Sequence, residues 1–184
     1  MLDSLLHYQK KINAAQIVHD LGIKQPFVLA TLHRQENLNN PKRYAAILGG
    51  LEKIAEDITV VLPAHPRLQP LLNEQHFKAF KIITPQPYLN MLALLQQCNL
   101  VLTDSGGLQK EAFYSQKYCI TLREETEWTE LLNLDVNKLV KPNAQEIKAT
   151  FTALHKRPFA KVLNPYGDGQ TAERILSHLG LTNA

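Results

Sequence analysis

Cysteine is scarce in this sequence, which has only Cys98 and Cys119 among its 184 residues. A small fold held together by disulfides needs several paired cysteines, so that class is excluded. Each cysteine lies in or beside an apolar segment, and neither has a second cysteine at metal-binding spacing. We therefore expect two reduced thiols in the core, with a disulfide or a Cys/His metal site as the minority alternative. No metal and no cofactor are expected.

Long hydrophobic runs are also missing. No window reaches the roughly 18 uninterrupted apolar residues that a membrane span requires. The first residues, MLDSLLHYQKK, place their charges after a short apolar segment and lack a small-residue cleavage pattern, so they do not resemble a signal peptide. A cytoplasmic location is the expectation, and no membrane partner is expected.

An excess of one charge is the third absence. The chain has 20 Lys and Arg residues against 17 Asp and Glu residues, a net charge of +3. This charge is small and scattered, and it does not predict binding to nucleic acid. It is compatible with an anionic small ligand.

Short apolar, β-branched runs recur along the chain and alternate with segments of helical spacing. This alternation predicts βαβ units, and hence an α/β fold with a Rossmann-like, doubly wound parallel sheet in a single domain over residues 1–184. The strands are expected at Phe27 to Leu32, Ile58 to Leu62, Phe80 to Ile83, Leu100 to Thr103, Cys119 to Leu122 and Lys138 to Val140.

Helix boundaries are well marked in two places. Asn40 before Pro41 resembles an N-cap followed by proline at the first helical position. Asp168 and Gly169 precede the last helix. A first helix, at about Leu2 to Asp20, comes before any strand, which is unusual for a complete doubly wound domain. We interpret it as part of a longer parent chain, on the side that faces another domain.

Polar residues gather directly after four of the predicted strands. In a doubly wound sheet, ligands bind outside the carboxyl ends of the strands, so these residues predict one shared cleft. They are His33, Arg34, Glu36 and Asn37 after the first strand, His65 and Arg67 after the second, 104–107 after the fourth and 123–127 after the fifth.

The stretch TDSGGLQKEA, residues 103–112, is the most informative of these segments. Its glycine pair allows a ligand to approach the backbone, and the helix that follows presents free N–H groups, so the arrangement suits a phosphate. We place Gln109 and Glu111 in the first helical turn, where Glu111 can accept hydrogen bonds from ribose hydroxyls. When the stretch is taken alone, a plain glycine turn, in which Glu111 complements the helix dipole, is about as favoured as a ligand site.

Single residues support weaker hypotheses. His33 and Arg34 suit an acid, a base or a diphosphate clamp, although an isolated histidine is more often a loop or capping residue. Ser105 lacks the surrounding pattern of a nucleophile elbow, so we expect its hydroxyl to contact phosphate. The acidic run 123–131, whose first residues are placed in the cleft above, has a plainer interpretation. It is then a solvated helix start in which Trp128 covers the core.

Taken together, the ordered segments resemble the UDP-N-acetylglucosamine 2-epimerase family. The resemblance rests on TLHRQEN (31–37), LPAHPR (62–67), PQPYLNMLALLQQCNLVLTDSGGLQKEA (85–112), LREETEWTELL (122–132) and NPYGDGQTAERI (164–175). It implies the C-terminal half of a two-domain GT-B fold that binds a UDP-sugar between its halves.

The resemblance also implies residue roles. His33 is implied at the active site, near the diphosphate and the sugar. Ser105, Gly106 and Gly107 are implied to contact the diphosphate, with Arg34 beside it and Glu111 on the ribose. A second set of cleft residues consists of Glu36, His65, Arg67, Arg123 and Glu127. In some bacterial members, Arg34 and His65 match positions that bind a second, regulatory UDP-sugar, although HPR here departs from the histidine-led sequence usual in those members.

The family's proton-transfer lysine and carboxylates lie on its N-terminal half, which this sequence does not include. Met1-Leu2-Asp3 resembles an internal start within the family's linker. The expected function is therefore the UDP-sugar-binding C-terminal domain of a UDP-N-acetylglucosamine 2-epimerase-like isomerase, inactive alone, that pairs with an N-terminal domain in cis or trans or forms a homodimer. TEWTEL resembles members that act on modified UDP-sugars. The alternatives are half of a GT-B glycosyltransferase and a stand-alone UDP-sugar-binding regulatory module.

Overall fold

In the computed structural model, which describes residues 1–72 and 74–181, six parallel strands form one sheet in the order β3-β2-β1-β4-β5-β6. This order is that of a Rossmann-like doubly wound fold, which confirms the predicted fold class. Each strand matches a predicted one to within one or two residues. The strands are β1 Phe27–Thr31, β2 Thr59–Pro63, β3 Lys81–Ile83, β4 Val101–Thr103, β5 Cys119–Thr121 and β6 Asn137–Leu139.

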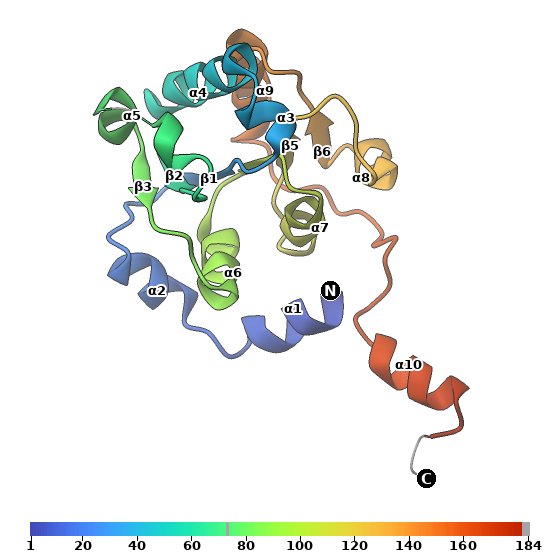
Figure 1. Cartoon of the computed structure of the whole chain (residues 1–184). Coiled ribbons are helices and arrows are strands. Elements are labelled where there is room, and N and C mark those ends of the chain that lie inside the picture. The colour runs from blue at the N-terminus through green and yellow to red at the C-terminus, as the bar shows by residue number, and fades with distance from the viewer. Residues whose placement is uncertain (73, 182–184) are drawn as a thin grey trace.

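Helices cover both faces of the sheet (Figure 1). α4 Pro41–Ala55 and α9 Ala144–Leu154 cover one face, and α2 Ala14–Asp20, α6 Tyr88–Gln97 and α7 Gly106–Tyr114 cover the other. Successive residues of β1 point to opposite faces, so Val28 joins the core under α4 and α9 while Leu29 joins the core under α2, α6 and α7. Burial on both faces explains why the strand sequences are apolar runs that do not alternate with polar residues.

The N-terminal segment differs from its prediction as a single helix. It forms two helices, α1 Leu2–Gln9 and α2, because Asn13 between them accepts a hydrogen bond from the backbone of Gln16 at 3.1 Å and begins a new helix. The other helices are short: α3 Gln35–Leu38, η1 Gln69–Leu71, α5 Glu74–Ala79, α8 Thr129–Asn133 and α10 Thr171–His178.

The predicted cap of α4 is confirmed. The Asn40 side chain accepts hydrogen bonds from the backbone N–H groups of Lys42 and Arg43, and Pro41 opens the helix. The same helix packs closely on α9 at Gly50, where a Cβ atom would lie only 2.9 Å from Ile147. The missing side chain at Gly50 therefore sets the distance between these two helices.

α10 lies apart from the two helical layers (Figure 1). Asp168 and Gly169 precede it as predicted, but the acceptor for its first N–H groups is Asp3 of α1. One carboxylate oxygen of Asp3 accepts from the backbone of Thr171 at 2.8 Å and of Ala172 at 3.3 Å. The apolar side chains at this helix remain exposed: Ile175 within α10 is 54% exposed, and Leu179 directly after it is 62% exposed.

Cys98 and Cys119 are buried free thiols, as predicted. Burial raises the pKa of each thiol to about 12. Within the described residues, no helix is long and apolar enough to cross a membrane.

Candidate functional site

The candidate site lies at the edge of the sheet where the parallel strands have their carboxyl ends. Because all six strands are parallel, the loops after β1, β2, β4 and β5 emerge at this same edge. The predicted residues after β1, β4 and β5 form a connected set of hydrogen bonds and ion pairs. The following paragraphs build this set outward from its buried centre.

Asp104, directly after β4, is that centre. Its side chain has no exposed surface, and it accepts hydrogen bonds from the backbone N–H groups of His33 and Arg34 and from the side-chain amide of Asn37. The imidazole Nδ1 of His33 lies 2.9 Å from the same carboxylate. Burial raises the pKa of Asp104, but the hydrogen bonds from His33 and Arg34 outweigh burial and hold the pKa below its usual value. Asp104 is therefore an ionised acceptor that fixes the loop after β1.

The glycine turn, residues 105–107, follows Asp104 and opens α7. Ser105 is the N-cap, and its hydroxyl accepts from the backbone of Leu108 at 3.4 Å. The N–H groups of Gly106 and Gly107 make no hydrogen bond to any residue that the structure describes. Two open donors at a helix N-terminus suit an anionic group. The Ser105 hydroxyl, which sequence analysis assigns to phosphate, serves in this structure as the helix cap.

Four charged side chains, from the segments after β1 and after β5, meet beside the glycine turn. Arg123 is 4% exposed, and its guanidinium lies 2.9 Å from Glu127 and 3.5 Å from Glu36. Arg34 lies 3.4 Å from Glu127, and its Nε donates to the backbone oxygen of Asp104 at 2.9 Å. The Glu127 pKa is lowered by a hydrogen bond from its own backbone and then by Arg123. This cluster joins most of the second set of predicted cleft residues to the glycine turn.

A buried polar network behind the turn was not predicted. The Gln109 side-chain oxygen accepts from Thr126 at 2.6 Å and from Asn137 at 3.0 Å, and its amide donates to the Ser105 backbone. Trp128 donates its indole N–H to the Gly106 backbone oxygen at 2.7 Å. Gln109 therefore holds the loop after β5 against α7. A glutamine inside an amphipathic helix gave no sequence signal for burial, since glutamine is usually exposed.

Glu111 lies in the second turn of α7, not the first as predicted, because the helix already begins at Gly106. Burial raises the pKa of its carboxyl group. Burial, and secondly the charge of Glu111, also raise the pKa of Tyr88, the first residue of α6. Glu111 is thus a partly desolvated carboxyl close to the start of α6, and its role on ribose stays a prediction.

The loop after β2 contributes His65 and Arg67, both exposed. The ring centroids of His65 and His33 are 6.0 Å apart, so two imidazoles from neighbouring strands face the same region. The His65 Nδ1 accepts from the Arg67 backbone at 3.2 Å. Chemically, the edge offers two imidazoles, the guanidinium groups of Arg34, Arg67 and Arg123, and two open backbone donors, which together suit a phosphorylated ligand.

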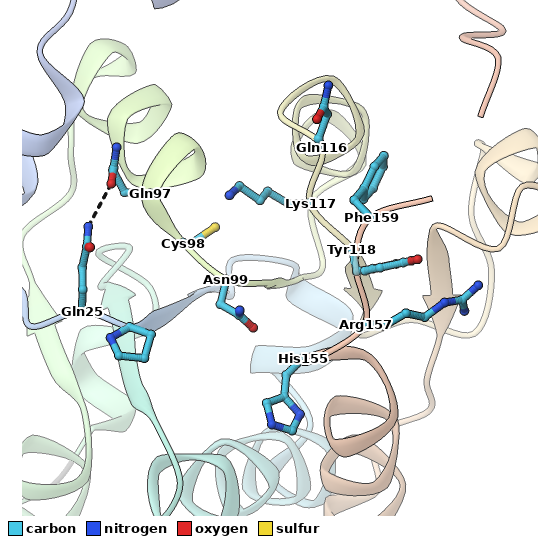
Figure 2. Close-up of a pocket in the computed structure, with 11 residues that line it drawn as sticks. Gln25, Gln97, Cys98, Asn99, Gln116, Lys117, Tyr118, His155, Arg157 and Phe159 are labelled. Carbon is cyan, nitrogen blue, oxygen red and sulfur yellow. Dashed lines mark hydrogen bonds between the residues drawn. The ribbon is translucent and has the colours of Figure 1, made fainter. Parts of the chain in front are cut away.

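A separate pocket lies at the opposite, amino-terminal edge of the sheet (Figure 2). It has a volume of about 440 Å³, and its lining includes Asn99, Lys117, Tyr118, His155 and Arg157. α6, α7 and α9 all end at this edge, and their C-terminal dipoles account for the basic side chains gathered there. None of the predicted site residues lines this pocket. It is therefore distinct from the candidate site.

Comparison with protein families gives one match over nearly the whole chain. The family model described as UDP-N-acetylglucosamine 2-epimerase matches residues 1–180. The UDP-2,3-diacetamido-2,3-dideoxy-D-glucuronate 2-epimerase of Pseudomonas aeruginosa is 38% identical over 181 residues, which cover 97% of this chain and 50% of that protein. The UDP-N-acetylglucosamine 2-epimerase of Methanocaldococcus jannaschii is 37% identical over 185 residues, covering 95% of this chain and 50% of that protein.

Solved structures agree with the sequence relatives. The UDP-GlcNAc 2-epimerase of Methanocaldococcus jannaschii matches with a TM-score of 0.86 at 33% identity, covering 98% of this chain and 54% of that one. Its complex with UDP-GlcNAc and UDP matches with a TM-score of 0.84 at 32% identity, covering 98% and 53%. The chain thus spans about half the length of the relatives it matches.

Proposed function

Because the chain belongs to the UDP-N-acetylglucosamine 2-epimerase family, we propose that it is the UDP-sugar-binding half of an enzyme that inverts C2 of a UDP-N-acetylated sugar. One observation carries the proposal: the open N–H groups of the glycine turn lie beside Arg34 at the edge of the sheet. A matched protein of the same fold has a structure described as a complex with UDP-GlcNAc and UDP, which supports the same ligand here.

The geometry suggests a role for each group. The diphosphate would accept hydrogen bonds from Gly106 and Gly107, with Arg34 and Arg123 supplying positive charge. Glu127 neutralises both guanidinium groups, at 3.4 Å from Arg34 and 2.9 Å from Arg123. Glu127 would then exchange these contacts for solvent when phosphate binds. His33 would lie against the diphosphate and the sugar.

The sugar itself is proposed at the level of its class. The relatives include one named for UDP-N-acetylglucosamine and one named for a diacetamido-glucuronate derivative. Both names describe UDP-activated hexoses that carry an acetamido group at C2. We therefore propose this class of substrate, with the choice between the two set by contacts to C3 and C6.

The partner is proposed from the share of the relatives that the chain spans. About half of each relative lies outside the match, so we propose that a complementary half closes the cleft, either in the same chain or as a separate subunit. The exposed apolar side of α10, with Ile175 and Leu179, would pack on it. In the absence of that half, we expect this face to favour homodimers.

Calorimetric titration of the purified chain with UDP and with uridine tests the proposal. UDP should bind more tightly, because uridine leaves the N-terminus of α7 unoccupied. Affinity should be modest, since a ligand in an open half-cleft keeps part of its surface in water. Equal binding of UDP and uridine, or no binding of UDP, would contradict the assignment of the glycine turn.

Two variants sharpen the test. Gly107→Val should weaken UDP more than uridine, and it should fold, because a Cβ atom there would meet only Met1 at an ordinary 3.8 Å. Glu111→Ala should weaken both ligands by up to about 1.5–3 kcal/mol, the usual value of a charge-assisted hydrogen bond. Glu56→Ala, at the exposed end of α4, is the matched control and should change neither affinity.

A further inference from the structure

The contact between Asp104 and His33 has a chemical consequence for the imidazole. The carboxylate oxygen Oδ1 lies 2.9 Å from Nδ1 of His33, and the same oxygen lies 3.1 Å from the His33 backbone N–H. His33 is therefore held at two points, its ring and its backbone. The other ring nitrogen, Nε2, makes no hydrogen bond to any residue in the described part of the chain, and the side chain is 42% exposed.

The donor in this contact follows from the surroundings of Asp104. Three N–H donors other than the imidazole already point at its two oxygens, from the backbones of His33 and Arg34 and from the Asn37 amide. A carboxylate in that environment is ionised and can only accept, so Nδ1 must carry the proton. In a neutral imidazole, a proton on Nδ1 leaves a lone pair on Nε2.

We propose that Asp104 is a positioning residue for the active site, which fixes His33 in the Nδ1–H tautomer and presents Nε2 to the bound UDP-sugar. This inference deepens the proposed function, because the ligand it names rests on that function. Without Asp104, histidine in water prefers the opposite tautomer, with the proton on Nε2 and the lone pair on Nδ1. The carboxylate thus selects the less common form.

Asp104 also counters the positive charge around the imidazole. The groups that face His33 are Arg34 from the same loop, His65 from the loop after β2, with its ring centroid 6.0 Å away, and Asp104 from the end of β4. Arg34 and His65 bring positive charge close to the ring, and the buried carboxylate is the negative group on its other side that offsets this charge.

Nitrogen-15 NMR of the histidine ring tests the tautomer in the wild-type chain, with His33→Gln used to assign the resonance. At a pH where His33 is neutral, we expect a pyrrole-type shift for Nδ1 and a pyridine-type shift for Nε2. A predominantly Nε2–H form, or the mixture found for free histidine, overturns the proposal. This measurement needs no ligand, so it stands even if UDP fails to bind and the proposed function fails.

Asp104→Asn tests the positioning role. It keeps the size of the side chain and removes the carboxylate acceptor, so the nitrogen-15 shifts of the His33 ring should move toward the tautomer mixture found for free histidine. A folded variant that keeps the wild-type tautomer contradicts the proposal. If the variant does not fold, the tautomer measured by nitrogen-15 NMR in the wild-type chain decides whether the proposal holds. Asp20→Asn is the matched control: Asp20 lies 3.4 Å from His19 and both side chains are well exposed, so the substitution should leave the nitrogen-15 shifts of the His19 ring nearly unchanged.

Discussion

At the scale of single residues, burial decides which groups can react. Cys98 and Cys119 are both nearly inaccessible, and their pKa of about 12 lies far above neutral pH. His33, in contrast, keeps a partly exposed ring that is anchored through one nitrogen. The imidazole is therefore accessible to a ligand at the site, and the thiols belong to the core beneath α6 and α7.

The thiols give a direct prediction. At pH 8, a thiol-specific reagent should modify neither cysteine in the native chain, because both are buried and protonated. In urea it should modify both. Since the folded pKa is raised from 9.0 to about 12, the stability that the thiols contribute is complete below pH 9 and is lost as pH rises toward 12. Rapid labelling of either cysteine in the native state would contradict this placement.

At the scale of elements, the sequence predicts the sheet well because period and burial are local signals. Six apolar runs correspond to six observed strands. The break at Asn13 was missed, since residues 2–20 keep a helical apolar spacing on both sides of it. Side-chain partners distant in sequence were also missed. Gln109 meets Asn137 and Thr126 only after α7, β6 and the loop after β5 have folded together.

The same distinction holds within the candidate site. Sequence position alone brought His33, Arg34 and the glycine turn to one edge, because parallel strands place their carboxyl ends together. It did not identify Asp104 as the centre, although an acid directly after a buried strand was a usable signal. The number of hydrogen bonds that converge on Asp104 depends on the loop after β1, whose path the sequence does not specify.

The α4–α9 contact supports a prediction at this scale. Gly50→Ala should destabilise the chain by about 1–3 kcal/mol, because the added Cβ would lie 2.9 Å from Ile147 and force the helices apart. The adjacent Gly49→Ala is the matched control, since its Cβ would meet Ala144 at an ordinary 3.7 Å and helix propensity favours alanine. Urea denaturation of both variants measures the difference. Equal stability of the two variants would show that the helices adjust freely.

At the scale of the whole molecule, the apolar side of α10 is uncovered. We expect the isolated chain to self-associate at micromolar concentration in sedimentation velocity, because Ile175 of α10 and Leu179 at its end are 54% and 62% exposed. Leu179→Glu should shift the distribution toward monomer. Glu173→Gln, on the same helix, leaves the apolar residues intact and should not. A wild-type chain that stays monomeric would remove the reason to expect homodimers.

The proposed half-cleft also limits the chemistry. Inverting C2 of a sugar requires a proton to leave one face of the carbon and to return to the opposite face. In the described site Asp104 contacts His33, and Glu127 and Glu36 contact Arg123, and we propose that the groups that move this proton lie in the complementary half. Supplied with UDP-N-acetylglucosamine, the isolated chain should therefore yield no UDP-N-acetylmannosamine by chromatography or proton NMR.

Adding the N-terminal half of a relative as a separate polypeptide should restore turnover, and His33→Gln in this chain should abolish it again. Epimerisation by the chain alone would show that this half holds the complete proton-transfer machinery and would overturn the division of labour proposed for the two halves.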